Sequence, residues 1–350
     1  MILSFAYPSS PDRTGGVTVL YELANACARR GHQVHFVHGP LTPYRVRVLD
    51  ELPPFRFDER VEHHLVDRLD DTGLPSGDVV FGGTAPRRLG LPVDLVQGFR
   101  MLREDVERDL YRSPFPKVCV ASWLVDVGIR HGAPPGQLWY VPLGIDHRTF
   151  SVHTPQDRRD YDVAMLFHPH REKGFAVGLE ALVDLRRRMS QLRAIVFGID
   201  PPAFPLADWV RFLRAPDHAT LAREVYNRSR IFLQPSYHEG FGYTAVEGMA
   251  CGCALVTTDN GGSHDYAVDG QTALVVAPGD APALAAAAER LLRDHAERAR
   301  LAEAGAELVR RRFDWDNTAA LLEPRLEAYV ADPARYQQPP VDALAGEGAG

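Results

Sequence analysis

Residues 237–259 read YHEGFGYTAVEGMACGCALVTTD, and this stretch decides the fold. Gly240 and Gly242 predict a turn, and the short run of small residues after them is predicted to be helical. The apolar stretch 253–257 that follows is typical of a buried strand, and another apolar strand, 231–234, precedes the glycines. The order strand, turn, helix, strand indicates a parallel sheet covered by helices.

The same alternation of short apolar strands and amphipathic helices recurs along the whole chain. Strands are predicted at residues 2–7, 33–38, 78–81, 93–96, 117–121 and 138–141, and again at 163–167, 192–197, 210–213, 231–234 and 254–257. Helices are predicted at residues 17–30, 174–189 and 243–250, and from residue 281 onward. This β–α alternation favours parallel sheets with helices on both faces.

A polar segment interrupts the alternation at residues 151–162, SVHTPQDRRDYD, which have no apolar period. Because 350 residues exceed what one core commonly supports, the break predicts a boundary between two domains. We expect an α/β protein with two Rossmann-like, doubly wound parallel sheets that face across a cleft. Ligands of such sheets bind beyond the carboxyl ends of the strands. Residues 334–350 are predicted to be a disordered tail.

The composition argues against several classes of protein. A net charge of −7 is not that of a general nucleic-acid-binding protein. No apolar run reaches the length of about 18 residues that a membrane span needs, and no signal peptide is expected. We therefore expect a cytoplasmic protein, for which peripheral contact with the inner face of a membrane stays open. The cysteines lie in apolar segments, which predicts buried thiols: Cys27, Cys119, Cys251 and Cys253.

Two carboxylates, Glu239 and Glu247, stand on either side of the glycine turn. Glu239 follows a strand and is expected at the carboxyl edge of the sheet. The helix that begins near Tyr243 has a partial positive charge at its first turn, which is a natural seat for phosphate. This arrangement suits a nucleoside diphosphate sugar, with Glu247 facing the ribose and Glu239 the sugar. Taken alone, the pair is equally compatible with a solvated loop residue and a helix-dipole partner.

A pyrophosphate beside two carboxylates also requires cations. The segment HPHREKGF, residues 168–175, follows the predicted strand 163–167 and supplies Arg171 and Lys173. Both are placed to bind phosphate and to stabilise charge on a leaving group. Considered singly, they are also compatible with exposed basic residues that lead into a helix.

Gly15 and Gly16 follow the first strand and open the first helix. Their spacing is not GxGxxG, and the second strand ends without the acidic residue that holds an NAD ribose, which argues against a dinucleotide oxidoreductase. The pair predicts either a tight turn or a close backbone approach to a ligand in the interdomain cleft. No metal is expected, because Cys251 and Cys253 lack a second ligand pair at zinc spacing.

Residues 235–280, PSYHEGFGYTAVEGMACGCALVTTDNGGSHDYAVDGQTALVVAPGD, closely resemble the C-terminal half of the retaining GT-B glycosyltransferases of family 4, the glycosyl transferases group 1. The segment VPLGIDHRTF, residues 141–150, resembles the hinge of that family, and the GG and RGH residues at 15–32 extend the similarity. The resemblance covers roughly the first 330 residues. It implies an acceptor-binding domain at 1–152, a nucleotide-sugar-binding domain at 160–312 and a helix at 313–331 that crosses back to the first domain.

The resemblance also implies roles for single residues. Glu239 would contact the donor sugar, Glu247 the ribose, and Lys173 the phosphate. The diphosphate would meet the backbone of four further residues, namely Phe241, Gly242, Tyr243 and, from the other domain, Gly16. A turn at residues 261–263 is expected either near the cleft or as a plain turn.

Two positions depart from the family pattern. His168 stands where the family has an arginine; a histidine beside phosphate would have a raised pKa and could be cationic, or Arg171 could take its place. Gln97 stands where a histidine often faces the acceptor, and glutamine cannot act as a base. A base is dispensable if the departing phosphate itself takes the acceptor proton, which the family's retaining mechanism permits.

We therefore expect a retaining glycosyltransferase that needs neither metal nor cofactor beyond its donor, a nucleoside diphosphate sugar with UDP or GDP as the first choices. The acceptor, a sugar, a lipid-linked sugar or a natural product, would be set by residues 40–116. That stretch includes six arginines that would meet an acidic acceptor or an anionic lipid, or simply aid solubility: Arg45, Arg47, Arg87, Arg88, Arg100 and Arg103. A glycoside hydrolase, a nucleotide-sugar epimerase of the same fold and a non-catalytic nucleotide-sugar-binding partner are the alternatives.

Overall fold

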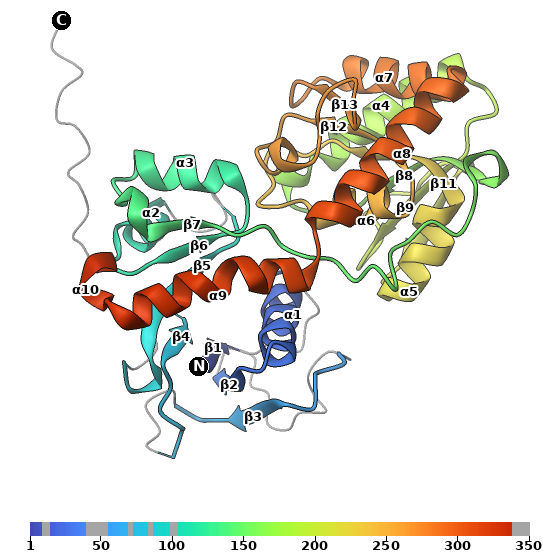
Figure 1. Cartoon of the computed structure of the whole chain (residues 1–350). Helices are drawn as coiled ribbons and strands as arrows, with labels where there is room; N and C mark the ends of the chain where they lie inside the picture. The colour runs from blue at the N-terminus through green and yellow to red at the C-terminus, as the bar shows by residue number, and fades with distance from the viewer. Residues whose placement is uncertain (9–14, 40–54, 69–72, 83–86, 99–103, 338–350) are drawn as a thin grey trace, which may run out of the picture. The chain divides into compact units, whose positions relative to one another are not determined.

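The computed structural model describes residues 1–8, 15–39, 55–68, 73–82, 87–98 and 104–337. The chain forms two compact units, one made of Met1–Gly144 with Trp315–Gly350 and the other of Ile145–Asp314 (Figure 1). The expected first domain ran to residue 152, but the first unit ends at Gly144. Ile145 forms a β-bridge with Asp314, and the Ile145 N–H donates to the Phe313 carbonyl at 3.2 Å. These contacts place the chain on either side of the second unit, at residues 145 and 313–314, within that unit.

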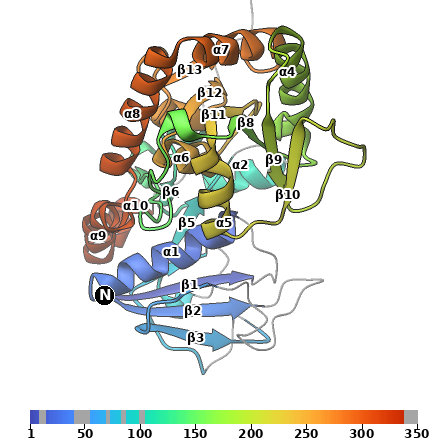
Figure 2. The same cartoon turned by 90° about the vertical axis from the view of Figure 1, so that its right-hand side faces the viewer.

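The first unit contains a seven-stranded parallel sheet in the order β3-β2-β1-β4-β5-β6-β7. Its strands are β1 (Ile2–Pro8), β2 (Gln33–Gly39), β3 (Val61–Leu65), β4 (Val79–Phe81), β5 (Leu91–Val96), β6 (Lys117–Cys119) and β7 (Leu138–Tyr140). Strand β3 was not predicted, because its sequence VEHHL has little apolar content. It lies at the edge of the sheet, where less of a strand is buried (Figure 2).

Five helices are described in the first unit: α1 (Gly15–Arg29), α2 (Glu104–Arg112), α3 (Ser122–Arg130), α9 (Trp315–Ala331) and α10 (Pro333–Tyr336). Helices α2 and α3 were not predicted from the sequence. Helix α9 is tied to the sheet by two side chains: Thr318 Oγ1 donates to the Pro142 carbonyl at 2.8 Å, and the Tyr329 hydroxyl donates to the Pro92 carbonyl at 3.2 Å. The last part of the chain thus folds with the first unit.

Residues 334–336, predicted to begin a disordered tail, are instead helical in α10. The reason is aromatic packing, since the Tyr336 ring meets the Trp139 and Tyr329 rings edge to face at centroid distances of 5.8 and 5.7 Å. The rest of that predicted tail, from residue 338 on, lies outside the described residues.

The second unit contains a six-stranded parallel sheet in the order β10-β9-β8-β11-β12-β13. Its strands are β8 (Tyr161–Leu166), β9 (Ala194–Gly198), β10 (Val210–Arg214), β11 (Ser229–Gln234), β12 (Ala254–Thr258) and β13 (Ala273–Val276). The chain begins in the centre at β8, builds outward to β10, and returns beside β8 to build the other half. Strand order therefore reverses between β8 and β11, and ligands of doubly wound sheets bind beside such a switch point.

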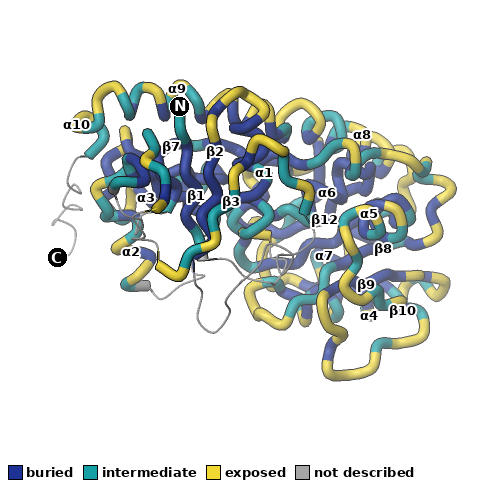
Figure 3. Tube along the Cα trace, turned by 90° about the horizontal axis from the view of Figure 1, so that it is seen from below, coloured by how far each residue is buried: buried dark blue, intermediate teal, exposed yellow. Residues whose placement is uncertain are grey.

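Helices cover both faces of this second sheet: α4 (Phe175–Arg188), α6 (Tyr243–Ala250), α7 (Ala281–Arg293) and α8 (His295–Arg312). Strands β9 and β12 are buried along their whole length while the outward helix faces are exposed, which explains the apolar residues of β9 and of the first three positions of β12 (Figure 3). The helical stretch from 281 is split at Asp294, whose side chain caps α8 by accepting from the Glu297 N–H. The prediction of two Rossmann-like parallel-sheet domains is confirmed.

No helix in the described part of the chain has the length and apolar content that crossing a membrane requires.

Candidate functional site

The sequence-predicted residues of the second unit follow the carboxyl ends of neighbouring strands. The segment with His168, Arg171 and Lys173 follows β8, and the segment with Glu239 follows β11. These two strands flank the switch point of the sheet. Backbone hydrogen bonds join the two segments directly, since the Tyr237 N–H donates to the Glu172 carbonyl at 2.8 Å. The fold therefore gathers at one edge residues that are more than sixty positions apart in sequence.

Glu239 is a buried carboxylate, only 7% exposed, with a cation beside it. Lys173 Nζ donates to its Oε2 at 2.8 Å, and the Ser236 hydroxyl donates to its Oε1 at 2.8 Å. The main chain fixes it too, because the Glu239 N–H donates to the Asn260 carbonyl at 2.9 Å. A carboxylate offers about four acceptor positions. Side chains of the described residues use two of them.

Lys173 reaches Glu239 because the residue after it is a glycine. Gly174 has φ of +65°, and a Cβ at this position would lie 1.9 Å from the Pro235 carbonyl oxygen. The backbone of the Lys173 turn thus packs directly on the backbone that follows β11. Gly174 is also the N-cap of α4, so a single glycine joins the lysine, the segment after β11 and the helix.

Helix α6 begins at Tyr243, as the sequence predicts, with Gly242 as its N-cap at φ of +92°. A glycine cap has no side chain to bind the N–H groups of the first turn, so backbone can approach a ligand closely there. A Cβ at Gly242 would meet the Tyr266 hydroxyl at 2.3 Å. The side chain of Phe241 faces inward and meets the rings of Tyr243 and Phe313 at 5.2 Å. Only the backbone of Phe241 is thus suited to ligand contact.

Glu247 lies in the second turn of α6 and is buried, with 6% of its surface exposed. The Tyr226 hydroxyl donates to its Oε2 at 3.0 Å. Burial, and then the neighbouring Glu247 carboxylate, raise the pKa of Tyr226 far above its usual range, so the phenol keeps its proton. Tyr226 follows a π-helical turn at Leu221–Val225, a distortion that often marks functional sites.

We expect Tyr226→Phe to lower the free energy of unfolding by about 1.5–3 kcal/mol, because the buried Glu247 carboxylate loses a charged hydrogen bond. The matched control is Tyr21→Phe. Tyr21 is equally buried, but its hydroxyl has no hydrogen-bond partner within the described residues, so the change should be close to neutral. Urea unfolding of both variants checks the difference, and equal losses would contradict the assigned role of the Tyr226 hydroxyl.

His168 is expected to have a raised pKa beside phosphate, and that response to a ligand stays a prediction; the protein's own groups act on its pKa in the other direction. Burial lowers the pKa of His168, and the neighbouring His170 and Lys173 lower it further. Its Nδ1 accepts a hydrogen bond from the His170 N–H at 3.1 Å, which requires that nitrogen to be unprotonated. In these surroundings the ring is therefore neutral at pH 7. Arg171, by contrast, lies exposed on the same turn as Lys173.

The other glycines of interest, Gly15 and Gly16, lie in the first unit at the start of α1, after β1. The Gly16 carbonyl accepts a hydrogen bond from Gln97 Nε2 at 3.2 Å. A Cβ at Gly16 would lie 3.3 Å from Gln97 Oε1, so the movable end of the Gln97 side chain would have to shift slightly to admit a larger residue. Their approach to a ligand stays a prediction. Of the six arginines, only Arg88 has a described side chain, and it reaches the Leu74 carbonyl.

A buried polar network under the site was not predicted from sequence. Gln234 Oε1 accepts hydrogen bonds from Thr257 at 3.0 Å, Tyr266 at 3.2 Å and Asn260 at 3.4 Å. Asn260 in turn accepts from the Ser263 N–H at 3.0 Å and so shapes the predicted turn at 261–263. The network supports the backbone at Glu239 and Gly242. Thr257, Asn260, Ser263 and Tyr266 stand three residues apart, but Gln234 lies more than twenty positions earlier, and only the pairing of β11 with β12 brings it to them.

Cys251 and Cys253 are buried free thiols, in agreement with expectation. Burial raises the pKa of Cys253 to about 11, so the thiol is not reactive at neutral pH. The buried Arg159 guanidinium donates to the carbonyls of Thr154, Tyr226, Ser229 and Cys251. This part of the unit is therefore structural.

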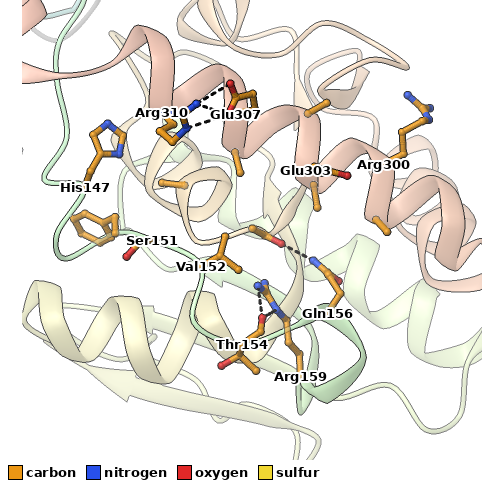
Figure 4. Close-up of a pocket in the computed structure, with 17 residues that line it drawn as sticks. His147, Ser151, Val152, Thr154, Gln156, Arg159, Arg300, Glu303, Glu307 and Arg310 are labelled. Atoms are coloured by element: carbon orange, nitrogen blue, oxygen red, sulfur yellow. Dashed lines mark hydrogen bonds and ion pairs between the residues drawn. The ribbon is translucent and has the colours of Figure 1, made fainter.

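The second unit also has a pocket of about 790 Å³ between α8 and the segment after Ile145 (Figure 4). One wall is formed by α8, which contributes Ala299, Ala302, Ala304 and Ala306 together with charged side chains, and the other by residues between 147 and 159. Arg310 on its rim is paired with Glu307 at 2.9 Å, and Arg159 is held by the Thr154 carbonyl (Figure 4). None of the sequence-predicted site residues is among the residues that line it.

Comparison with known proteins bears on both the fold and the site. Residues 153–308 match the family model described as glycosyl transferases group 1. Glycogen synthase of Mycobacterium tuberculosis is 34% identical over 177 residues, which is 48% of this chain and 42% of that protein. The chain thus spans about half the length of the curated relatives it matches.

Two solved structures share the fold over nearly the whole chain. Sucrose-phosphate synthase from Thermosynechococcus elongatus has a TM-score of 0.75 at 19% identity and covers 94% of this chain and 99% of its own. HepE of Anabaena, solved in complex with UDP-glucose, has a TM-score of 0.71 at 16% identity and covers 94% and 100%. The fold is therefore the GT-B fold. Within it, the similarity to the glycosyl transferases group 1 family extends over residues 153–308, which make up most of the second unit.

Proposed function

We propose that this protein is a glycosyltransferase that moves a sugar from a nucleoside diphosphate sugar to an acceptor hydroxyl. The observation that carries the proposal is the Lys173–Glu239 pair at the switch point of the second sheet. It combines a cation for phosphate with a fixed carboxylate that still has acceptor positions for sugar hydroxyls. A glycine-capped helix N-terminus follows within four residues.

The donor would be bound by the second unit. The first turn of α6 would meet the diphosphate with backbone N–H groups at Phe241, Gly242 and Tyr243, and Glu247 would accept hydrogen bonds from the ribose. The hydrogen bond from the Tyr226 hydroxyl to Glu247 Oε2 would help to orient the carboxylate for this purpose. Because the related HepE fold was solved with UDP-glucose, a UDP-sugar is the first donor to test, and a GDP-sugar the second.

The phosphate charge would be met by Lys173 and Arg171. His168 is the weaker choice, because the surroundings that lower its pKa also keep it neutral near pH 7. We expect Arg171→Ala to weaken donor binding at pH 7.5 by about tenfold, the worth of one partly exposed charge-assisted contact of about 1.4 kcal/mol. His168→Asn should change it less than about threefold. Isothermal titration with the donor checks both, and a larger loss in His168→Asn would reverse the assignment.

We further propose that neither a metal nor another cofactor is required. Two side-chain cations and a helix N-terminus supply the positive charge that a metal otherwise contributes to diphosphate departure. The transfer would retain the anomeric configuration, with the departing phosphate taking the proton of the acceptor hydroxyl, as the resemblance to family 4 implies. The first unit would choose the acceptor, which is a sugar, a lipid-linked sugar or a natural product.

The direct test is turnover with UDP-glucose and then GDP-mannose in the presence of EDTA, with a panel of hydroxyl acceptors. We expect release of the nucleoside diphosphate that depends on the acceptor, and a product whose anomeric proton coupling in NMR matches that of the donor. Inverted product would overturn retention. Donor binding without any release across the panel would favour a non-catalytic nucleotide-sugar-binding protein.

A further inference from the structure

A separate group of ionisable side chains lies in the first unit, between strands β2 and β3. In the parallel register of these strands, His35 is opposite Glu62 and Val37 is opposite His64. Alternate residues of a strand face the same side of the sheet, so Glu62 and His64 share a face with His35. Strand β3 is the edge of this sheet, beside β2 (Figure 2).

The three side chains direct their ligand atoms toward one point. His35 Nδ1 lies 3.0 Å from His64 Nε2 and 3.4 Å from Glu62 Oε2, and all three ligand atoms lie within 4.8 Å of one another. Zinc–nitrogen and zinc–oxygen bonds of about 2.0–2.2 Å at tetrahedral angles place neighbouring ligand atoms roughly 3.3 Å apart. Two of the separations already match that value to within a few tenths of an ångström.

We propose that His35, Glu62 and His64 bind a divalent transition-metal ion, for which Zn²⁺ is the first choice. Two imidazoles and one carboxylate form a ligand set that zinc commonly takes, and they leave a fourth position for water or another ligand. The site is open to solvent on one side, because the Glu62 side chain is 58% exposed while His35 is buried.

The surroundings of His35 support this assignment. The Gln33 amide contacts the second ring nitrogen of His35, Nε2, at 3.1 Å and holds the ring in place. A histidine bound to metal through Nδ1 carries its proton on Nε2, and the Gln33 amide can turn its oxygen toward that proton. A metal ion bound by these residues would thus link β2 to β3, an edge strand with few apolar residues to hold it in the sheet.

The opposite face of the same two strands supplies an internal control. His38 and His63 also contact one another, at 2.9 Å between ring nitrogens. They pack among aromatic side chains, with His63 4.3 Å from the Phe57 ring and His38 4.8 Å from the Phe36 ring. His38 and His63 are therefore a second pair of imidazoles on β2 and β3. They pack among aromatic rings, whereas His35 and His64 lie beside the Glu62 carboxylate.

The test uses the full chain, stripped with EDTA, dialysed and titrated with ZnCl₂ by isothermal titration, with bound zinc counted by elemental analysis. We expect one Zn²⁺ per chain and a melting temperature that rises with zinc concentration by mass action. Removing a side chain that binds the zinc directly should weaken zinc affinity by more than the roughly 10- to 100-fold that follows from changing a residue that only contacts a zinc ligand. His64→Ala should therefore bind at least about 100-fold more weakly, and Glu62→Gln at least about tenfold.

His63→Ala is the matched control, since it removes a neighbouring imidazole from the opposite face of the same strand. It should keep one zinc at an affinity within about threefold of the unaltered chain, the scatter expected for a residue outside the ligand shell. Glu62→Gln keeps the proposal testable if His64→Ala does not fold, because Glu62 is exposed. Absence of stoichiometric zinc, or equal binding by Glu62→Gln and the unaltered chain, would overturn the site.

Discussion

Replacing Gly174 with alanine is expected to lower the free energy of unfolding by about 3–5 kcal/mol, which combines the cost of a left-handed non-glycine residue with that of overpacking. The new Cβ would lie 1.9 Å from the Pro235 carbonyl oxygen, and the obstacle is backbone, which cannot rotate away. The turn that holds Lys173 would have to move away from the backbone of Pro235, in the segment that follows β11. Urea unfolding of the full chain, with hydrogen exchange in α4 and β11, measures the loss.

Gly270 supplies the matched control for this substitution. Its φ of +67° is nearly the same as the +65° of Gly174, but a Cβ there would meet nothing within 4 Å. Gly270→Ala should therefore cost only the backbone strain, about 1–2 kcal/mol. The difference between the two variants isolates the contact with Pro235. Equal losses would show that the close backbone approach does not hold the Lys173 turn in place.

Replacing Lys173 with alanine is expected to have the largest effect on function, a loss of at least about 100-fold in turnover of the donor. The substitution removes the cation proposed to stabilise the leaving diphosphate. It also leaves the Glu239 carboxylate, which is 7% exposed, with the Ser236 hydroxyl but without its ion-pair partner. A loss of stability of about 1–3 kcal/mol should accompany it.

Stability alone must be separated from function in that experiment, and another ion pair of the same unit allows this. Arg230 and Asp162 lie 2.7 Å apart with side chains 26% and 19% exposed, against 27% and 7% for Lys173 and Glu239. Arg230→Ala should be destabilised to a similar degree but keep the kcat/KM of the unaltered chain to within about threefold. If both variants lose turnover equally, Lys173 acts only through stability.

The sequence predicts most of the fold because its strands are buried on both faces. The strands β9 and β12 are fully buried, and the apolar runs AIVF in β9 and ALV in β12 could be recognised without knowledge of their partners. Edge strand β3, with the sequence VEHHL, has no such run, and its place in the sheet depends on pairing with β2. Helix α10 depends on aromatic contacts with Trp139 and Tyr329, which are likewise distant in sequence.

The glycines and charged residues that the fold brings together at the candidate site were selected from the sequence. The side chains that hydrogen-bond to them were not. Glu239 and Glu247 could be selected by their place around a glycine turn. The hydroxyls that bind them, from Ser236 and Tyr226, belong to common residue types with no diagnostic spacing. The pKa of His168 was expected to rise beside phosphate, whereas the protein around it lowers that pKa through burial and two neighbouring basic side chains.

The measurement that tests the central claim most directly is isothermal titration of nucleoside diphosphate sugars into the unaltered chain and into Glu247→Gln. The substitution keeps the size of the side chain and its contact with Tyr226 but removes the charge that would accept both ribose hydroxyls. We predict one donor that binds at one site per chain and binds Glu247→Gln at least about tenfold more weakly, a loss of about 1.4 kcal/mol. Equal affinity in the two proteins would contradict the placement of the nucleotide at α6.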